Sequence, residues 1–145
     1  MRDVRRSALL PYAPAQVYGL VADVERYPEF LPWCTAARIL AQEGDEVTVT
    51  LGLASGLARA SFTTRNRLEP DRSLTMSLVE GPFDHLEGRW QFTPISNAGT
   101  RADLHVAFAT HGVIGAIALG PAFESACTHL VDAFARRARQ VFGGR

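Results

Sequence analysis

The residues that come nearest to a catalytic group in this sequence are Asp84, His85 and Glu87. Histidine is the side chain that general acid–base catalysis uses most often. Here His85 and Glu87 alternate with Leu86 and Gly88 along an expected strand, so both lie on its solvated face. No persuasive nucleophile with an adjacent base, carboxylate pair or phosphate-binding loop occurs elsewhere. We therefore expect no catalytic residue and predict that the protein is not an enzyme.

The four histidines and two cysteines do not have the spacing of a metal site. His105 and His111 share neither a strand face nor a helix turn, and Cys34 and Cys127 are far apart. Two thiols also make a poor disulfide framework for a domain of this size, so we interpret both as reduced. The sequence therefore predicts no metal site and no required cofactor.

Composition indicates one ordinary domain covering residues 1–145, of which 47% are hydrophobic. The 15 basic residues balance the 15 acidic ones, so no global positive field attracts DNA, although a local basic patch stays open. The apolar run 8–10 is too short for a signal peptide, and the stretch 113–123 falls below the roughly 20 residues of a membrane span. We expect a cytoplasmic protein whose contact with the inner membrane is at most peripheral and transient.

Hydrophobic periodicity predicts a strand followed by two helices in the first part of the chain. Residues 4–10 have the pattern of a strand, and Pro14 suits the first position of a helix whose apolar stripe continues to Val24. A second short helix is expected at 28–31. These elements precede a long region of different periodicity.

Residues 35–109 alternate with period two, and turn signals divide them into six strands. After Gly112 the spacing becomes helical up to Phe142, which would give a helix of about 45 Å if it were unbroken. Pro121 is expected to kink this helix or to start it anew. The fold class is therefore α+β, with a curved antiparallel sheet of about seven strands wrapped around a long C-terminal helix. The space between them is either packed or kept as an apolar cavity.

Three blocks of residues resemble a known family. They are Asp-Val-Glu-Arg-Tyr-Pro-Glu-Phe-Leu-Pro-Trp-Cys at 23–34, Phe-Thr-Thr-Arg-Asn at 62–66 and Gly-Pro-Phe-Asp-His-Leu-Glu-Gly-Arg-Trp-Gln-Phe-Thr-Pro at 81–94. They are similar to the coenzyme Q-binding and ribosome-association toxin A family of START-like, helix-grip proteins in the polyketide cyclase/dehydrase superfamily. The chain departs from this pattern at 84–85, where many relatives are basic, and at 120–121, where relatives continue the last helix.

The resemblance implies non-catalytic binding of a hydrophobic small molecule, with an isoprenoid quinone (coenzyme Q) as the leading candidate, in support of respiration. Flat aromatic rings could stack on the quinone head, although a packed core explains the same residues. The loop 27–33 is a candidate gate, and His129 a candidate donor to a quinone carbonyl or a satisfied interfacial histidine. The candidate ligand-binding residues are Phe30, Trp33, Phe62, Met76, Trp90, Phe92, Phe108, Phe123, His129, Leu130 and Phe134.

Two alternatives stay open. The family also includes proteins that block association of the ribosomal subunits, and a cluster of arginines could bind the RNA of the large ribosomal subunit, unless these are ordinary solvated side chains. An aromatic polyketide cyclase is the weaker alternative, resting on fold analogy alone. The candidate ribosome-binding residues are Arg5, Arg6, Arg65, Arg67, Arg136, Arg137 and Arg139.

Overall fold

Alternating apolar residues build one antiparallel sheet, and the helices come early and late in the chain. The computed structural model describes residues 1–96, 99–110 and 113–143, with the backbone alone for 113–118. The strands are β1 (Arg2–Leu10), β2 (Cys34–Glu43), β3 (Glu46–Ser55), β4 (Ala58–Glu69), β5 (Ser73–Glu80), β6 (Phe83–Ile95) and β7 (Gly99–Thr110). The helices are α1 (Pro14–Ala22), the 3-10 helix η1 (Val24–Glu29), α2 (Val113–Thr128) and α3 (Leu130–Phe142).

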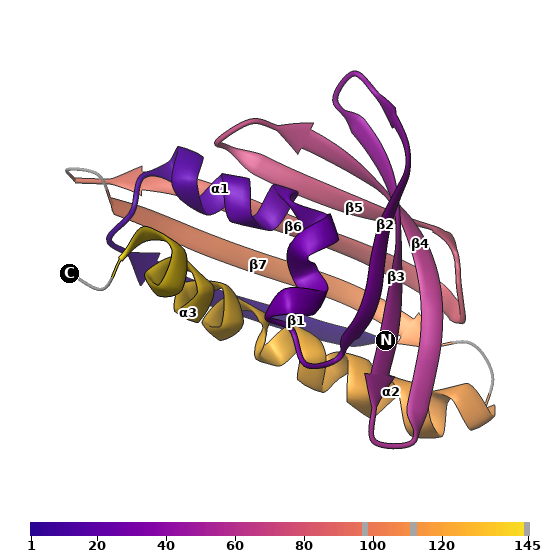
Figure 1. Ribbon diagram of the computed structural model, residues 1–145. Helices are drawn as coiled ribbons and strands as arrows, with labels where there is room; N and C mark the ends of the chain where they lie inside the picture. Colours follow the sequence, from indigo (N-terminus) through magenta and orange to yellow (C-terminus); the bar gives the residue numbers. More distant parts are fainter. Residues whose placement is uncertain (97–98, 111–112, 144–145) are drawn as a thin grey trace.

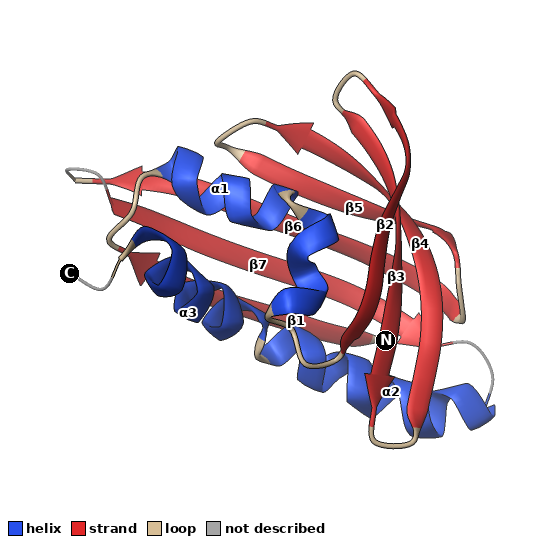
Figure 2. Cartoon of the chain, viewed as in Figure 1, coloured by secondary structure: helices blue, strands red, loops and turns tan. Residues whose placement is uncertain are grey.

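The strands lie in the order β1-β7-β6-β5-β4-β3-β2, and the first strand therefore pairs with the last. The sheet is strongly curved, and α2 and α3 follow one another along its inner face (Figure 1). Figure 2 shows that α1 and η1 cover the same face. This arrangement confirms the predicted α+β helix-grip fold. None of the described helices is long and apolar enough to cross a membrane.

β6 shows how sequence periodicity sets the two faces of the sheet. Leu86, Gly88, Trp90 and Phe92 are buried, whereas the residues between them are exposed. Successive side chains of a strand point to opposite faces, so one face of the strand joins the core and the other faces water. The alternation predicted from the sequence is confirmed.

Aromatic rings fill much of the space between the sheet and the helices. Phe108 on β7 is 0% exposed, and its ring centroid lies 4.7 Å from that of Phe123 on α2. Trp90 on β6 lies 5.4 Å from Phe134 on α3, in an edge-to-face arrangement. Such ring pairs stabilise the core beyond the area that they bury. The two C-terminal helices are thereby fixed to the centre of the sheet.

The short helix after α1 begins earlier than predicted. It is a 3-10 helix over Val24–Glu29 rather than a helix at 28–31, and Pro28 lies near its end instead of at its start. The Tyr27 hydroxyl donates a hydrogen bond to the Val21 carbonyl, and the Phe30 and Leu31 amides donate to the Tyr27 carbonyl. These bonds make Tyr27, not Pro28, the residue around which the chain folds.

The predicted break of the last helix at Pro121 is also wrong, because α2 continues through Pro121 to Thr128. The interruption comes at His129, the cap residue of α3. Two backbone bonds still cross it, from the His129 amide to Ser125 and from the Ala133 amide to His129. The predicted turn at 97–99 and the residues His111 and Gly112 lie partly or wholly outside the described residues.

Phe108→Ala is expected to lower the free energy of unfolding by about 3–5 kcal/mol, because it removes a fully buried ring from the core. Chemical denaturation followed by circular dichroism measures the change. Leu57→Ala is the control, since the Leu57 side chain is 99% exposed and its loss should change stability by no more than about 0.5 kcal/mol. Equal losses for the two variants would contradict the placement of Phe108 in the core.

Candidate functional site

An internal cavity of about 60 Å³ lies between the curved sheet and the C-terminal helices. Strands β3 to β7 line one side, η1 and Trp33 line one end, and α2 and α3 close it. Its surface is predominantly apolar. The lining residues are Val24, Tyr27, Trp33, Val49, Leu51, Phe62, Thr64, Asn66, Met76, Leu86, Gly88, Trp90, Val106, Phe123, Ala126, Cys127 and Leu130.

The cavity contains few polar groups. The Thr64 hydroxyl donates to the side-chain oxygen of Asn66 at 2.8 Å, and Asn66 is only 4% exposed. The Tyr27 hydroxyl is engaged by the Val21 carbonyl, and burial raises the pKa of this phenol, so it stays protonated. Among the described residues, the site therefore offers an amide and two indole side chains for hydrogen bonding, and no acid–base pair.

The two cysteine thiols are poor nucleophiles near neutral pH. Burial raises the pKa of Cys127, which lines the cavity, to about 12. Burial also raises the pKa of Cys34 to about 11, although its contact with the Ala36 carbonyl works in the opposite direction. Only the thiolate is a good nucleophile, so neither cysteine is suited to covalent chemistry near neutral pH.

A second hollow, of about 350 Å³, lies outside the cavity and is open to the surface. It runs between the loop after η1 and the helices α2 and α3, and Arg136 and His129 are on its rim. Trp33 and Ala126 line both the hollow and the internal cavity. These two side chains therefore form the partition between the surface and the interior.

Six of the predicted ligand-binding residues do line the cavity: Trp33, Phe62, Met76, Trp90, Phe123 and Leu130. Five do not, namely Phe30, Phe92, Phe108, His129 and Phe134.

Contacts with other protein groups account for four of the five predicted residues that do not line the cavity. Phe108 and Phe134 are core rings, and Phe92 stacks on Trp90 with a centroid distance of 6.0 Å. Phe30 packs on Phe134 at 5.1 Å and lies under the Arg137 guanidinium. Each of these four rings therefore packs against other protein groups instead of lining the cavity.

His129 is exposed, with its Nδ1 atom 2.8 Å from the Ser125 carbonyl oxygen. It does not line the cavity, and the contact with a quinone carbonyl stays a prediction. The sequence prediction also omits Thr64 and Asn66. Their signal was present, because both occupy inward positions in the alternation between Phe62 and Leu68.

The predicted arginine surface is divided between two faces of the molecule. Arg5, Arg65 and Arg67 are exposed on the outer face of the sheet, whereas Arg136, Arg137 and Arg139 belong to α3, which covers the inner face. Arg6 is opposite Leu104, at the open edge of β1. The sheet therefore separates Arg5, Arg65 and Arg67 from the arginines of α3.

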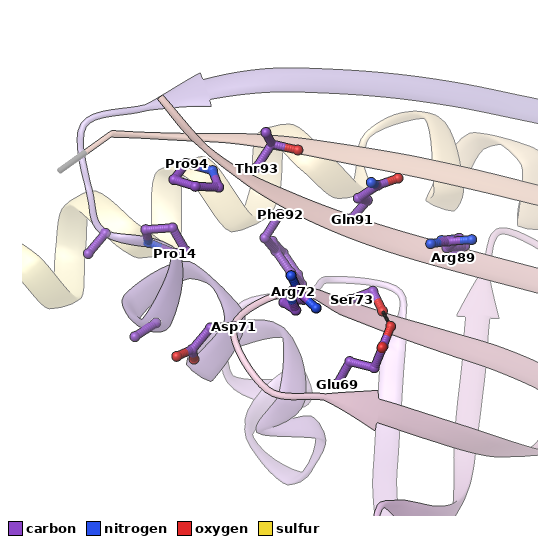
Figure 3. Close-up of a pocket in the computed structure, with 12 residues that line it drawn as sticks. Pro14, Glu69, Asp71, Arg72, Ser73, Arg89, Gln91, Phe92, Thr93 and Pro94 are labelled. Carbon is purple, nitrogen blue, oxygen red and sulfur yellow. Dashed lines mark hydrogen bonds between the residues drawn. The ribbon is translucent and has the colours of Figure 1, made fainter. Parts of the chain in front are cut away.

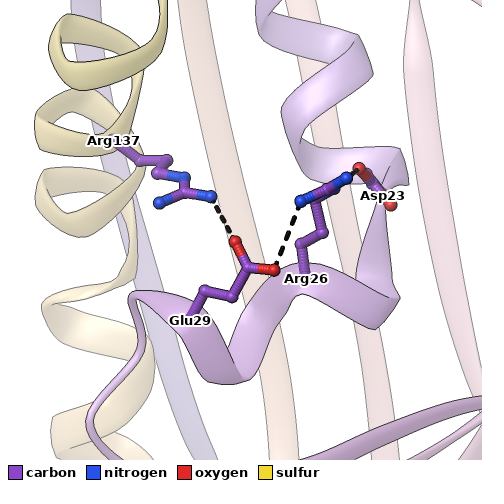
Figure 4. A network of polar contacts seen from close by, with 4 residues as sticks. All are labelled: Asp23, Arg26, Glu29 and Arg137. Atoms are coloured by element: carbon purple, nitrogen blue, oxygen red, sulfur yellow. Dashed lines mark hydrogen bonds and ion pairs between the residues drawn. The ribbon is translucent and has the colours of Figure 1, made fainter.

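Arg137 has a structural role instead. It donates to Glu29 at 2.6 Å, and Glu29 also pairs with Arg26, which pairs with Asp23 (Figure 4). This network joins η1 to α3. Such partly exposed ion pairs each add little stability, but together they fix the position of the loop that carries Trp33.

Among the described residues, no group of three or more His, Cys, Asp or Glu side chains is arranged to hold a metal ion. His105 is bonded to Asp3 on the sheet's outer face, and His85 lies near Glu87. His111, also considered from the sequence, lies outside the described residues.

Burial raises the pH at which both thiols ionise, and labelling with a thiol reagent can test this. In the folded protein, labelling by Ellman's reagent at pH 8 should be at least about 10-fold slower than in urea-unfolded protein, since the raised pKa lowers the thiolate fraction. The labelling rate should rise only as the pH approaches about 11. Equal rates for folded and unfolded protein would contradict the burial of the thiols.

Comparison with known proteins supports this architecture. The family model described as "Polyketide cyclase / dehydrase and lipid transport" matches residues 10–135. Two solved structures share the fold. The Zhui aromatase/cyclase from Streptomyces sp. R1128 has a TM-score of 0.84 at 21% identity and covers 97% of this chain and 95% of that one. A START superfamily protein from Mycobacterium smegmatis has a TM-score of 0.81 at 18% identity, covering 96% and 98%.

Curated relatives match over nearly the whole chain. The Ribosome association toxin RatA of Pseudomonas aeruginosa is 42% identical over 140 residues, 97% of each chain. RatA of Escherichia coli K12 is 39% identical over 145 residues, covering 100% of this chain and 92% of the relative. The Coenzyme Q-binding protein COQ10 homolog B of Xenopus laevis is 24% identical, covering 97% of this chain and 59% of the relative.

Proposed function

The chain belongs to the polyketide cyclase/dehydrase and lipid transport family, and we propose that it associates with the ribosome by binding, without catalysing a reaction. The observation that carries the proposal is the full-length similarity to proteins named ribosome association toxins, at 39–42% identity. The similarity extends over the edge strands of the sheet, β1 and β2, as well as over the helices. A function that depends on the molecular surface can therefore be common to these proteins.

The chemistry of the cavity supports binding rather than catalysis. Its polar side chains are one amide, two hydroxyls, the Cys127 thiol and the indoles of Trp33 and Trp90. The Thr64 and Tyr27 hydroxyls already donate to protein acceptors. A cyclase needs groups that can move protons, and among the described residues the cavity lining contains neither a histidine nor a carboxylate. The likeness to an aromatase/cyclase, at 21% identity, concerns the fold alone.

The size of the cavity supports the proposal of ribosome association over that of quinone binding. A water molecule needs roughly 10–15 Å³ of such space, so a cavity of about 60 Å³ accommodates about five water-sized groups. Pockets for drug-sized ligands are typically about 300–1,000 Å³. A substituted quinone ring with a prenyl tail would require Trp33 or the helices to move.

In a sedimentation assay, the purified protein is expected to move with the large ribosomal subunit at about 0.1 M salt and to be released progressively as salt increases, because ion-pair contacts with RNA are screened. The small subunit serves as the matched control particle and should retain much less protein. Failure to sediment with either subunit at low salt would contradict the proposed function.

Binding of a small hydrophobic ligand is a second candidate function, favoured by the apolar lining of the cavity and by its partition from the surface at Trp33 and Ala126. Burying a hydrocarbon stabilises a complex by about 0.8 kcal/mol per CH₂ group, so few polar contacts would be needed. Displacement of the Trp33 ring would join the inner cavity to the outer hollow. A prenyl quinone is one ligand of this class.

Organic extraction of the purified protein, followed by mass spectrometry, is expected to release a hydrophobic molecule in substoichiometric or higher amount. Ala126→Leu should reduce its yield several-fold, because the larger side chain fills the partition. Ser125→Leu is the matched control, since Ser125 is exposed and lines only the outer hollow. An empty extract from wild-type protein would rule out a tightly held ligand, including a prenyl quinone.

A further inference from the structure

The outer face of the sheet carries a shallow groove of about 590 Å³ across β6, β7 and β1. We call it the arginine groove, defined by Arg5, Arg6, Arg89, Arg101 and His105. Arg6 differs from the other four, because it is opposite the buried Leu104 and lines the groove from the edge strand β1. These residues lie on three strands, of which β1 is far in the sequence from β6 and β7. The order of strands in the sheet brings them together, since β1 pairs with β7 and β7 with β6.

The strand register aligns the cations in a row. Arg5 is opposite His105, His105 is opposite Arg89, and Arg89 is opposite Thr75 on β5. Thr75 is in turn opposite Arg67 on β4. Neighbouring strands are about 4.8 Å apart, so the row from Arg5 to Arg67 is about 19 Å long. All of these side chains belong to the solvated face.

The groove is locally positive although the whole chain has no net charge. Four of its lining residues are arginines, and Asp103, paired with Arg101 at 3.1 Å, is its one acidic lining residue among the residues that the structure describes. Asp3 pairs with His105 and Arg5 near the edge. Within the described part of the chain, Arg89 has no hydrogen-bonding or acidic partner, so its guanidinium is available to a ligand.

The groove continues into a second one of about 660 Å³, which shares Arg89 and Gln91 with it. Figure 3 shows this second groove, where Arg72 lies close to Phe92 and Asp71 faces the start of α1. Arg89 and Gln91 therefore join the arginine groove to a second groove that extends to the turn between β4 and β5 and includes Glu69 and Asp71.

We propose that the arginine groove binds the phosphodiester backbone of ribosomal RNA; this inference rests on the proposed ribosome association. Guanidinium groups bind phosphate oxygens through two parallel hydrogen bonds, and an open groove admits an extended backbone. Among the described residues, the groove lining has no Phe, Tyr or Trp, so these residues offer no platform for stacking bases. Contacts to phosphates alone position the RNA without reading its sequence.

The experiment compares Arg5→Glu/Arg89→Glu with wild-type protein in binding to large ribosomal subunits and to protein-free ribosomal RNA. The double variant is expected to bind both at least about 10-fold more weakly at 0.1 M salt. The slope of log affinity against log salt should become shallower by about one for each arginine. Arg59→Glu is the matched control, because Arg59 is exposed on β4 outside the groove, and its affinity should stay within about twofold of wild type. Circular dichroism confirms that all variants are folded.

The other outcomes separate the two proposals. If wild type binds the subunit and the double variant binds as well as Arg59→Glu does, the groove is not the contact surface and ribosome association stands. If arginine-dependent binding occurs with the subunit but not with protein-free RNA, the partner is a ribosomal protein and the RNA assignment is overturned. If wild type binds neither, the proposed function fails and the inference fails with it.

Discussion

The need to cover the apolar inner face of a curved seven-stranded sheet determines the rest of the structure. The helices α2 and α3 meet this need, and the contacts of Phe123 with Phe108 and of Phe134 with Trp90 hold them in place. Where the sheet curves away from the helices, a cavity of about 60 Å³ is left. Dense ring packing on either side explains why this cavity is small.

The same sheet carries on opposite faces the two surfaces on which the proposals rest, the inner cavity and the outer arginine groove. The inner face, closed at Trp33 and Ala126, can hold only a small apolar group without rearrangement. The outer face is solvated, and the pairing of β1, β7 and β6 gathers arginines on it. Side chains on opposite faces of a strand do not touch, so substitutions can alter one surface and leave the other intact.

Local patterns in the sequence predicted the fold class and the number of strands, because alternation in segments such as β6 depends only on neighbouring residues. The break at His129 instead of Pro121 was not predictable, since a helix tolerates the loss of one hydrogen bond when its tertiary contacts are strong. Six of the predicted ligand-binding residues line the cavity. Arg89 was not linked to Arg5 from the sequence, because the pairing register of β1 and β7 cannot be deduced from either segment alone.

Ultraviolet cross-linking of the wild-type complex with ribosomal subunits, with the cross-linked peptides identified by mass spectrometry, tests the central claim most directly. It requires no substitution and reports which protein segments lie against RNA. The account predicts cross-links in β1, β6 and β7, around Arg5, Arg89 and His105, and few in α3. Cross-links concentrated in α3 around Arg136 and Arg139, with none in the three strands, would contradict it.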